Sequence, residues 1–388
     1  MRSKPCLVAM ALAFTLFASA ATAKFIMLQV FEGNNALFPI AGITIDNSGN
    51  IFGTSMYYGS SKKCPVGCGE IFETSPLGHG QWTTTALYSF EDGSDGAYPQ
   101  SPLTLDASGN LYGSIGAGNT SQIYRLAPQG SSWSFSVLSV FPQGDSADDY
   151  TPLLYANNSL LGLGWNGQGT IFQLTEPLGG GLPWTLTTPF TFPSGVRPDW
   201  IASDSGMQNI YVSTDEGNGT VVQLISGQPW TENILYSFKG GTDGYGPSFV
   251  MAGTDGSVYG TASGGRRQKK LGGGGIVFRL TPPQKSGGAW TKTTLHNFSG
   301  WPPTSLTAGP NGVLIGVVFG EEDAGAGYAF QLTPPQGQGE KSWTYRKLAG
   351  VKRSGSCNPM NVQYGKDHAV YGVLSGLCDS VAGIFEVK

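Results

Sequence analysis

The sequence predicts an all-β chain, a seven-bladed β-propeller with four strands per blade. A cassette recurs about seven times with a period near 50 residues, and 59 glycines accompany only 12% charged residues. Short strands and tight turns repeated at this period are typical of a propeller. We find no convincing stretch with the 3.6-residue period of an amphipathic helix.

The fourth strand of each unit is the clearest part of the cassette. It reads Trp, four residues, a hydrophobic residue, two more residues and Phe, and the last copy is degraded. The copies begin at Trp82, Trp133, Trp184, Trp230, Trp290 and Trp343. Because these tryptophans recur in nearly every unit, we expect them to pack between blades and not to form a ligand site.

Three strands precede this segment in each unit. The first follows a proline and ends near an aspartate, as in Pro102–Asp106, and a Gly-Asn or Asp-Gly turn then predicts a hairpin to the second strand. The recurring aspartates are expected to cap that turn. The third strand follows a glycine-rich loop and carries one aromatic or apolar anchor. The anchors, spaced 48 to 56 residues apart, are Phe72, Tyr124, Phe172, Val222, Phe278, Phe330 and Phe385.

The two ends of the chain predict how the ring closes. The last unit stops after its third strand, and Phe25–Phe31 resembles the missing fourth strand. We therefore expect the N-terminal strand to complete the C-terminal blade. Closure of this kind removes the open sheet edges that a linear array would expose.

The first 23 residues have the pattern of a signal peptide. A basic start at Arg2 and Lys4 precedes the apolar run Leu7–Phe17, and Ala21–Ala23 fits cleavage before Lys24. We expect a single propeller domain over residues 24–388, secreted or periplasmic. No later segment reaches 18 apolar residues, so no membrane span is expected.

The charge balance disfavours two classes of partner. Without Arg2 and Lys4 the chain has 20 basic and 26 acidic residues. Nucleic-acid binders and binders of anionic membranes need a basic surface. We expect a monomer that binds neither, and no cofactor.

Four cysteines remain after the predicted cleavage: Cys64, Cys68, Cys357 and Cys378. An even number in an exported chain predicts disulfides, with three connectivities open. Pairs 64–68 and 357–378 are geometrically easy, because each pair falls within one blade on the same face. Half a zinc site at Cys64 and Cys68 is the alternative, although no histidine lies near them in the sequence.

The motifs resemble the tandem repeat named after Gloeobacter and Verrucomicrobia, often called the GloVer repeat. The matching segments are Leu87–Phe90, Leu105–Gly113, Leu235–Gly244 and Val277–Pro282, and the third, sixth and seventh units depart from the pattern. The resemblance implies a secreted or surface-associated protein, frequently with a C-terminal anchor, which this chain does not show. It brings no established activity, so no catalytic residue is carried over from it.

Residues that occur in one unit only are the candidates for a site. After the six repeated tryptophans are set aside, Trp165, Trp200 and Trp301 remain, and all three are expected toward one face. Exposed aromatic rings with acidic and amide groups around a central pit suit a glycan, whose apolar faces stack on rings. The residues predicted to bind a ligand are Trp165, Trp200, Trp301, Tyr98, Tyr150, Tyr245 and Asp199.

Several alternatives stay open at this point. The aromatic residues could instead pack locally under long loops. Acidic glycine-rich segments around Asp95, Asp145 and Asp243 could hold calcium, although ordinary turns are favoured. No nucleophile elbow, phosphate loop or zinc-protease motif occurs. We therefore expect a binding module for a glycan or other extracellular polymer, or for a protein partner. The alternatives are a propeller enzyme of lyase or lactonase type and a structural surface protein.

Overall fold

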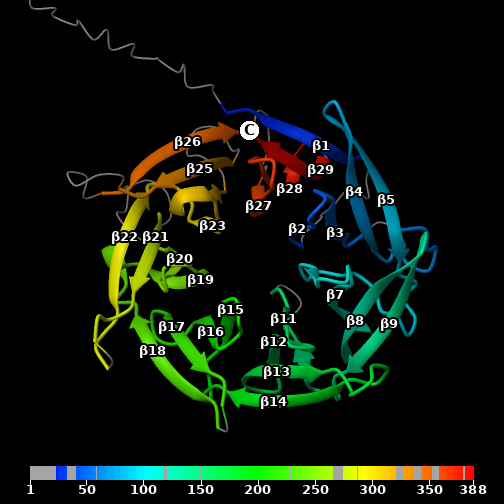
Figure 1. Ribbon diagram of the computed structural model, residues 1–388, viewed down its shortest axis with the longest axis horizontal. Coiled ribbons are helices and arrows are strands. Elements are labelled where there is room, and N and C mark those ends of the chain that lie inside the picture. Colours follow the sequence, from blue (N-terminus) through cyan, green and yellow to red (C-terminus); the bar gives the residue numbers. More distant parts are fainter. Residues whose placement is uncertain are drawn as a thin grey trace, which may run out of the picture.

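The protein is a ring of seven antiparallel sheets that stand as blades around a central axis (Figure 1). The prediction of a seven-bladed β-propeller is confirmed. In the described part of the chain there is no α-helix, and no helix long and apolar enough to cross a membrane. The computed structural model describes residues 23–32, 41–57, 59–117, 120–148, 151–227, 229–264, 274–285, 287–319, 327–335, 342–351, 358–378 and 381–388.

Blades 1 to 3 are formed by consecutive segments of the chain, and the innermost strand of each comes first. Blade 1 contains β2 (Thr44–Ile45), β3 (Ile51–Ser55), β4 (Glu70–Gly78) and β5 (Gln81–Ser89). Blade 2 contains β6 (Thr104–Leu105), β7 (Leu111–Ala117), β8 (Thr120–Gln129) and β9 (Ser132–Val140). Blade 3 contains β10 (Ser146–Ala147), β11 (Leu154–Ala156), β12 (Ser159–Trp165), β13 (Gly169–Thr175) and β14 (Thr185–Thr191).

Blades 4 to 7 follow the same order from the axis outward. Blade 4 contains β15 (Pro198–Ser203), β16 (Asn209–Thr214), β17 (Thr220–Ile225) and β18 (Thr231–Ser237). Blade 5 contains β19 (Tyr245–Ala252), β20 (Val258–Ser263), β21 (Gly275–Thr281) and β22 (Thr291–Phe298), with the 3₁₀ turn η1 (Gly241–Asp243) before it. Blade 6 contains β23 (Pro303–Ala308), η2 (Pro310–Gly312), β24 (Leu314–Val318), β25 (Tyr328–Thr333) and β26 (Thr344–Gly350). Blade 7 contains β27 (Asn358–Tyr364), β28 (Val370–Cys378), β29 (Val381–Val387) and β1 (Phe25–Glu32).

The N-terminal strand closes the ring as predicted. β1 pairs antiparallel with β29, with Phe25 opposite Val387, and the two strands lie side by side in Figure 1. The backbone N–H of Lys24 also donates to the carbonyl oxygen of Lys388 at 2.7 Å. Blade 7 therefore takes three strands from the C-terminal segment and one from the N-terminal segment.

Blade 3 differs from the predicted four strands because its innermost strand is in two pieces. Both β10 and β11 pair with β12, at its Trp165 end and its Leu161 end respectively. Pro152 precedes β11, and a proline has no N–H to donate to the neighbouring strand. The innermost edge of this blade is therefore interrupted near the axis.

The hydrophobic core is divided among the joints between blades. Seven clusters of buried residues each combine side chains of two adjacent blades, and the one around Ile43 and Ile384 joins blades 1 and 7. The repeated tryptophans contribute from the fourth strands: Trp133 of blade 2 lies edge-on to Phe52 of blade 1, with ring centroids 6.3 Å apart. The prediction that these tryptophans pack between blades is confirmed.

A glycine in the second strand makes room for the anchor of the third. In blade 1, a Cβ added to Gly53 would lie 2.6 Å from the ring of Phe72, which is fully buried. In blade 4 both residues of this pair are replaced: Val212 takes the place of the glycine, and the opposite residue Val222 takes the place of the aromatic anchor. Since protein cores are close-packed, a larger second-strand residue requires a smaller anchor.

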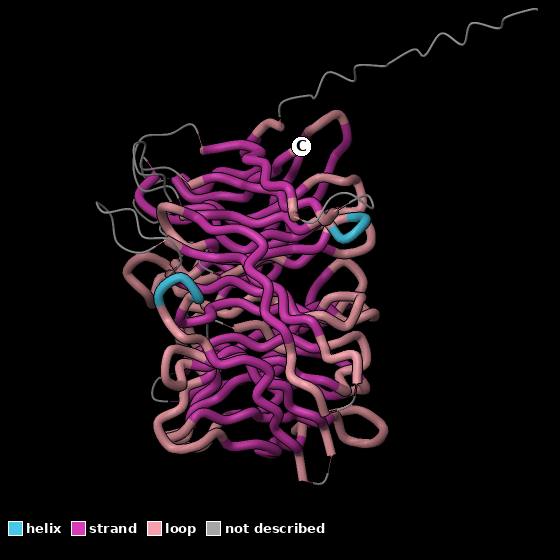
Figure 2. The backbone as a smooth tube through the Cα atoms, turned by 90° about the vertical axis from the view of Figure 1, so that its left-hand side faces the viewer, coloured by secondary structure: helices cyan, strands magenta, loops and turns pink. Residues whose placement is uncertain are grey.

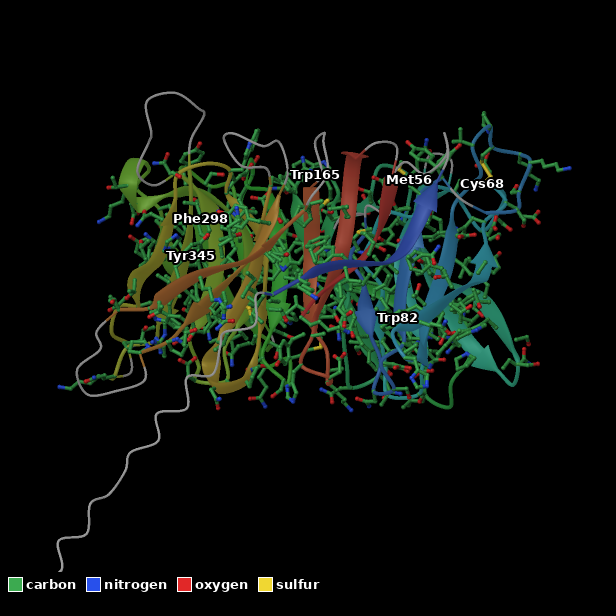
Figure 3. All side chains as sticks on the ribbon, turned by 90° about the horizontal axis from the view of Figure 1, so that it is seen from above. Met56, Cys68, Trp82, Trp165, Phe298 and Tyr345 are labelled. Atoms are coloured by element: carbon green, nitrogen blue, oxygen red, sulfur yellow. A yellow bond between two sulfur atoms is a disulfide. The ribbon has the colours of Figure 1, made fainter. Side chains whose placement is uncertain are left out.

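The two faces of the ring have different loops (Figure 2). We call the face that carries the blade-to-blade connections and the loops between second and third strands the loop face. The opposite face, which carries the hairpin turns, is the hairpin face. Trp165 and Cys68 lie toward the loop face and Trp82 toward the hairpin face (Figure 3).

Candidate functional site

The innermost strands place one residue of each blade at an equivalent level of the axis, directly before a buried aliphatic residue. Four of these seven residues are small or proline, and three are larger. They are Gly42, Pro102, Pro152, Trp200, Phe249, Ser305 and Asn361. Blades 4, 5 and 7 therefore place larger side chains at this level than the other blades do.

A cavity of about 530 Å³ opens along the axis at the loop face, and we call it the polar cavity. Side chains of five blades line it, and most of them are polar. The described lining residues are Gln100, Asp148, Thr151, Arg197, Asp199, Trp200, Asp215, Thr304, Met360 and Asn361. Asp199 and Trp200 were predicted from the sequence as ligand-binding residues, and the structure brings both to this cavity.

A second cavity of about 320 Å³ lies deeper along the axis, and we call it the apolar cavity. Trp200 and Asn361 line both cavities, and Phe249, Met251 and Leu306 are among the apolar side chains of the second. The Trp200 ring packs against Phe249 with centroids 5.0 Å apart, which leaves it half-buried. A ligand in the polar cavity would therefore meet an aromatic side chain held in place from behind.

A register shift in β15 aims two consecutive residues at the polar cavity. Pro198 stands opposite Thr214 and Trp200 opposite Ser213, so Asp199 is an extra residue in its strand. In a regular strand, neighbouring side chains point to opposite faces. An inserted residue of this kind re-aims a side chain, and here Asp199 and Trp200 both line the same cavity.

Register shifts also occur near the start of the innermost strands of blades 5, 6 and 7. A register shift between Met360 and Val362 makes Asn361 the extra residue, and its backbone has a φ of 43°. Asparagine tolerates this left-handed region better than most residues. The Asn361 side chain lies against Gly42 of blade 1, where a Cβ would clash with the amide nitrogen. The small residue in blade 1 therefore gives Asn361 its place at the axis.

Asp199 is the least satisfied carboxylate of the polar cavity. The pKa of its carboxyl is raised to about 6: burial is the largest cause, the negative charge of Asp215 adds to it, the Arg197 guanidinium opposes it, and Asp148 contributes a smaller increase. No described residue donates a hydrogen bond to the Asp199 side chain. A half-buried carboxylate without donors is unusual, because such groups are normally hydrogen-bonded.

Arg197 and Asp215 hold the rim of the polar cavity. The backbone N–H of Arg197 donates to Oδ1 of Asp215 at 2.7 Å, and the N–H of Asp215 donates to the Arg197 carbonyl oxygen at 3.0 Å. This pair ties the connection before β15 to the loop between β16 and β17. The Arg197 guanidinium stays exposed and forms no ion pair with a described residue.

Trp165 lies next to the polar cavity and not within it. It lines a groove of about 160 Å³ that shares Asp148 and Arg197 with the polar cavity, and its side chain is 40% exposed. The rings of Trp165 and Trp200 therefore flank one continuous run of polar groups across blades 3 and 4.

Three of the other predicted ligand-binding residues lie apart from the two cavities. Trp301 and Tyr245 are exposed and line neither of them. Tyr98, with a φ of 60°, lies edge-on to Tyr57 and donates its backbone N–H to the Cys68 carbonyl oxygen at 2.7 Å, so it packs locally. Tyr150 falls outside the described residues.

Of the four charged members of the polar cavity, the sequence predicted only Asp199 as a ligand-binding residue. Arg197 and Asp215 belong to no motif, and Asp148 stands out only as part of an acidic glycine-rich loop for which calcium is an alternative. Because charged residues also occur in the loops of other blades, they are a weaker signal than an unrepeated tryptophan.

Cys64 and Cys68 form a disulfide, one of the two predicted pairs. Both residues are buried within the loop between β3 and β4. Cys357 falls outside the described residues and Cys378 ends β28, so the pairing of 357 with 378 stays a prediction.

The acidic loop segments form turns. Asp95 accepts hydrogen bonds from the Tyr88 hydroxyl and from the backbone N–H groups of Glu91 and Gly93. Asp243 is held in the same way by the Tyr236 hydroxyl and by the Lys239 N–H. Within the described ranges, no group of three or more His, Cys, Asp or Glu residues could hold a metal ion.

The recurring aspartates cap the hairpin turns as predicted. Asp46 accepts from the N–H groups of Ser48 and Asn50, and Asp106 accepts the equivalent pair of bonds. Asp204 accepts from the N–H groups of Gln208 and Asn209, and Asp255 from that of Ser257. These carboxylates belong to the blade and not to a ligand site.

Comparison with known proteins gives the fold. No family model and no curated protein matches the sequence. Among solved structures, the β-propeller domain of Cps50 (Swd1) from Myceliophteria thermophila is similar, with a TM-score of 0.54, 11% identity and coverage of 94% of this chain and 100% of that one. A periplasmic gluconolactonase from Pseudomonas aeruginosa has a TM-score of 0.53 and 12% identity, over 85% of this chain and 94% of that one.

A fungal alcohol oxidase of the AA5 family, solved with copper, is also similar. Its TM-score is 0.57 at 12% identity, over 95% of this chain and 76% of that one. At such identities the likeness shows the propeller fold alone, because one fold hosts many unrelated functions.

Proposed function

We propose that this protein is a binding module whose ligand occupies the polar cavity. The observation that carries the proposal is the gathering of unrepeated residues at one mouth of the axis. Asp199, Trp200 and Asn361 come from two blades far apart in the sequence, and two local register shifts direct them to the same space. Repeated residues, in contrast, are used within and between blades.

The ligand class we propose is a glycan or another extracellular polymer. Half-exposed tryptophan rings beside carboxylates and amides suit a ring with an apolar face and polar edges. The polar cavity continues into the groove at Trp165, which gives room for more than one sugar unit. The predicted export of the chain and its resemblance to GloVer repeats support an extracellular polymer as the ligand.

An enzyme is the second candidate, and Asp199 is the observation that favours it. A carboxyl with a pKa of about 6 suits a general acid near neutral pH. His296, the unrepeated histidine of the fourth strands, does not assist, because it stacks on Tyr345 at 4.0 Å in the outer part of the ring. Release of product from a polysaccharide that binds would support this candidate. A structural surface role is the third.

The test is binding of residues 24–388 to a broad polysaccharide panel, with calcium and with EDTA. We expect a selective ligand, and we expect Trp165→Ala to weaken its binding about tenfold, as loss of one stacking ring implies. Trp301→Ala is the matched control, because Trp301 is an exposed tryptophan of the same face away from the cavity. A panel without any binding in either condition would overturn the glycan proposal.

A further inference from the structure

We propose that the polar cavity selects a glycan that carries free primary amines, an amino-sugar polymer in its protonated form. This inference rests on the proposed function and adds the chemistry of the ligand. The reason is a local excess of negative charge in a cavity that already offers an aromatic face.

The charge of the cavity follows from its described lining. Four ionisable side chains line it, namely three carboxylates, Asp148, Asp199 and Asp215, and one guanidinium, Arg197. No lysine or histidine appears among the described lining residues. Among these described groups, Asp199 and Asp215 alone already outnumber the one guanidinium of Arg197. A cationic group is therefore attracted, and an acidic polymer is repelled.

Arg197 does not neutralise the carboxylates. Its effect on the pKa of Asp199 is smaller than that of burial and that of Asp215, and the net shift is upward. The Arg197 side chain is exposed, so water screens its charge, whereas Asp199 is half-buried. Asp199 therefore lacks a cation of its own among the described residues.

Asp199 also lacks donors that a ligand ammonium would supply. The Asp243 carboxylate of the same chain does have an ammonium partner, because the Lys292 Nζ lies 2.8 Å from its Oδ1. Asp199 has no equivalent partner among the described residues. An ammonium offers three N–H donors, and hydrogen bonds between ionised groups are about twice as strong as neutral ones.

A sugar is favoured over a peptide as the carrier of the amine because of Trp200. The register shift sets Asp199 and Trp200 side by side on one wall of the cavity. An amino sugar presents an apolar ring face and an equatorial amine close together, which matches an aromatic ring next to a carboxylate. A lysine side chain presents its amine at the end of a flexible stem.

The experiment compares a β-1,4-linked glucosamine hexamer with the same hexamer after N-acetylation, by calorimetric titration at pH 6.5. Acetylation removes the charge and leaves the sugar backbone unchanged. We expect the free amine form to bind at least about tenfold more tightly, the value of one partly desolvated charge pair. Asp199→Asn should reduce that preference to about twofold or less.

Two further variants test the sign of the electrostatic effect. Arg197→Gln removes the one positive group among the described lining residues and should strengthen binding of the amine form, an increase that a purely structural role would not produce. Asp92→Asn removes one negative charge from an exposed position of the loop face outside the cavity and should leave the preference unchanged. Thermal unfolding of each variant verifies that it is folded.

The outcomes separate the inference from the proposed function. Equal binding of both hexamers, or tighter binding of the acetylated one, would overturn the amine selection and leave glycan binding standing. Binding of neither hexamer, together with a blank polysaccharide panel, would overturn both; a panel ligand without amines would overturn the inference alone. Hexalysine that binds as tightly as the glucosamine hexamer would overturn the sugar as the carrier.

Discussion

The carboxyl pKa values of two partly buried aspartates in this ring are shifted in opposite directions from the ordinary value. At the joint between blades 4 and 5, Asp243 receives donors from Lys292, Lys239 and Tyr236, and these lower the pKa of its carboxyl. In the polar cavity, Asp199 receives no donor from a described residue, and burial with a neighbouring carboxylate raises its pKa to about 6. The two residues differ in what surrounds them.

This difference distinguishes carboxylates that stabilise the ring from a carboxylate that is free to bind a ligand. Asp243 belongs to a motif that occurs twice with the same geometry, because Tyr88 and Asp95 repeat the bond of Tyr236 and Asp243. Asp199 is the extra residue of a register shift that recurs in blades 5 and 6, where the extra residues are Ser248 and Thr304, so among these three blades only blade 4 has a carboxylate there. A carboxylate that stabilises a fold normally accepts hydrogen bonds from that fold. A binding site can contain a carboxylate without such donors, at a cost in stability.

The largest expected effect comes from breaking the satisfied site. The Lys292 side chain is only 6% exposed and bonds the Asp243 carboxylate and its carbonyl oxygen. Lys292→Met leaves that carboxylate without its cation and should lower the free energy of unfolding by about 3 kcal/mol, as measured by denaturant titration.

The matched control for this prediction is an exposed ion pair. Lys63 and Glu91 lie 3.3 Å apart with side chains more than half exposed, so Lys63→Met should change stability by less than about 0.5 kcal/mol. The double variant Lys292→Met, Asp243→Asn should recover part of the loss, because no uncompensated charge remains. Equal effects at both pairs would contradict the proposed difference between a satisfied buried site and the surface.

The reverse effect is expected at Asp199. Its pKa is raised in the folded state, so the ionised carboxylate destabilises the fold at pH values above about 6, and this cost disappears as pH falls below the ordinary pKa of about 4. Asp199→Asn should therefore stabilise the protein by about 1 to 2 kcal/mol at pH 8, a value reduced for solvent screening. At pH 4 the gain should be absent.

Thermal unfolding of wild type and variant across pH 4 to 8 measures this gain. A variant that is equally stabilised at both ends of the range would show that the effect is one of packing. A variant that is destabilised at pH 8 would show that Asp199 has a donor and belongs with Asp243.

Much of the fold was predictable because each blade repeats its own rules. The Trp-x4-apolar-x2-Phe segment marks the fourth strand, and the pairing of β1 with β29 follows from counting strands at the two ends. The site was harder to predict, since it depends on which side chains stand at a recurring position. Register shifts occur near the start of the innermost strands of blades 4 to 7, and the extra residue is Asp199 in blade 4 and Asn361 in blade 7, whereas blades 5 and 6 have Ser248 and Thr304 there.

The contacts across the joints were also beyond the sequence. The residue two places after the repeated tryptophan covers the aromatic residue of the preceding blade. Phe135 stacks on Tyr88 at 4.4 Å, whereas Lys292 lies over Tyr236 at 5.6 Å. Periodicity predicts that this position is exposed or buried, but it does not predict that an aromatic ring and an ammonium group are interchangeable there.

The smallest expected effect distinguishes these two joints. Tyr88→Phe and Tyr236→Phe each remove one hydroxyl donor to an aspartate, and each should cost about 0.5 to 1 kcal/mol. The cost should be smaller at Tyr236, because Asp243 keeps the Lys292 ammonium while Asp95 keeps only backbone N–H donors. In a Lys292→Met background, where the lysine is gone, the cost of Tyr236→Phe should rise to at least that of Tyr88→Phe. Denaturant titration of the four variants measures this coupling, and a cost at Tyr236 that is independent of Lys292 would show that the ammonium and the hydroxyl stabilise Asp243 separately.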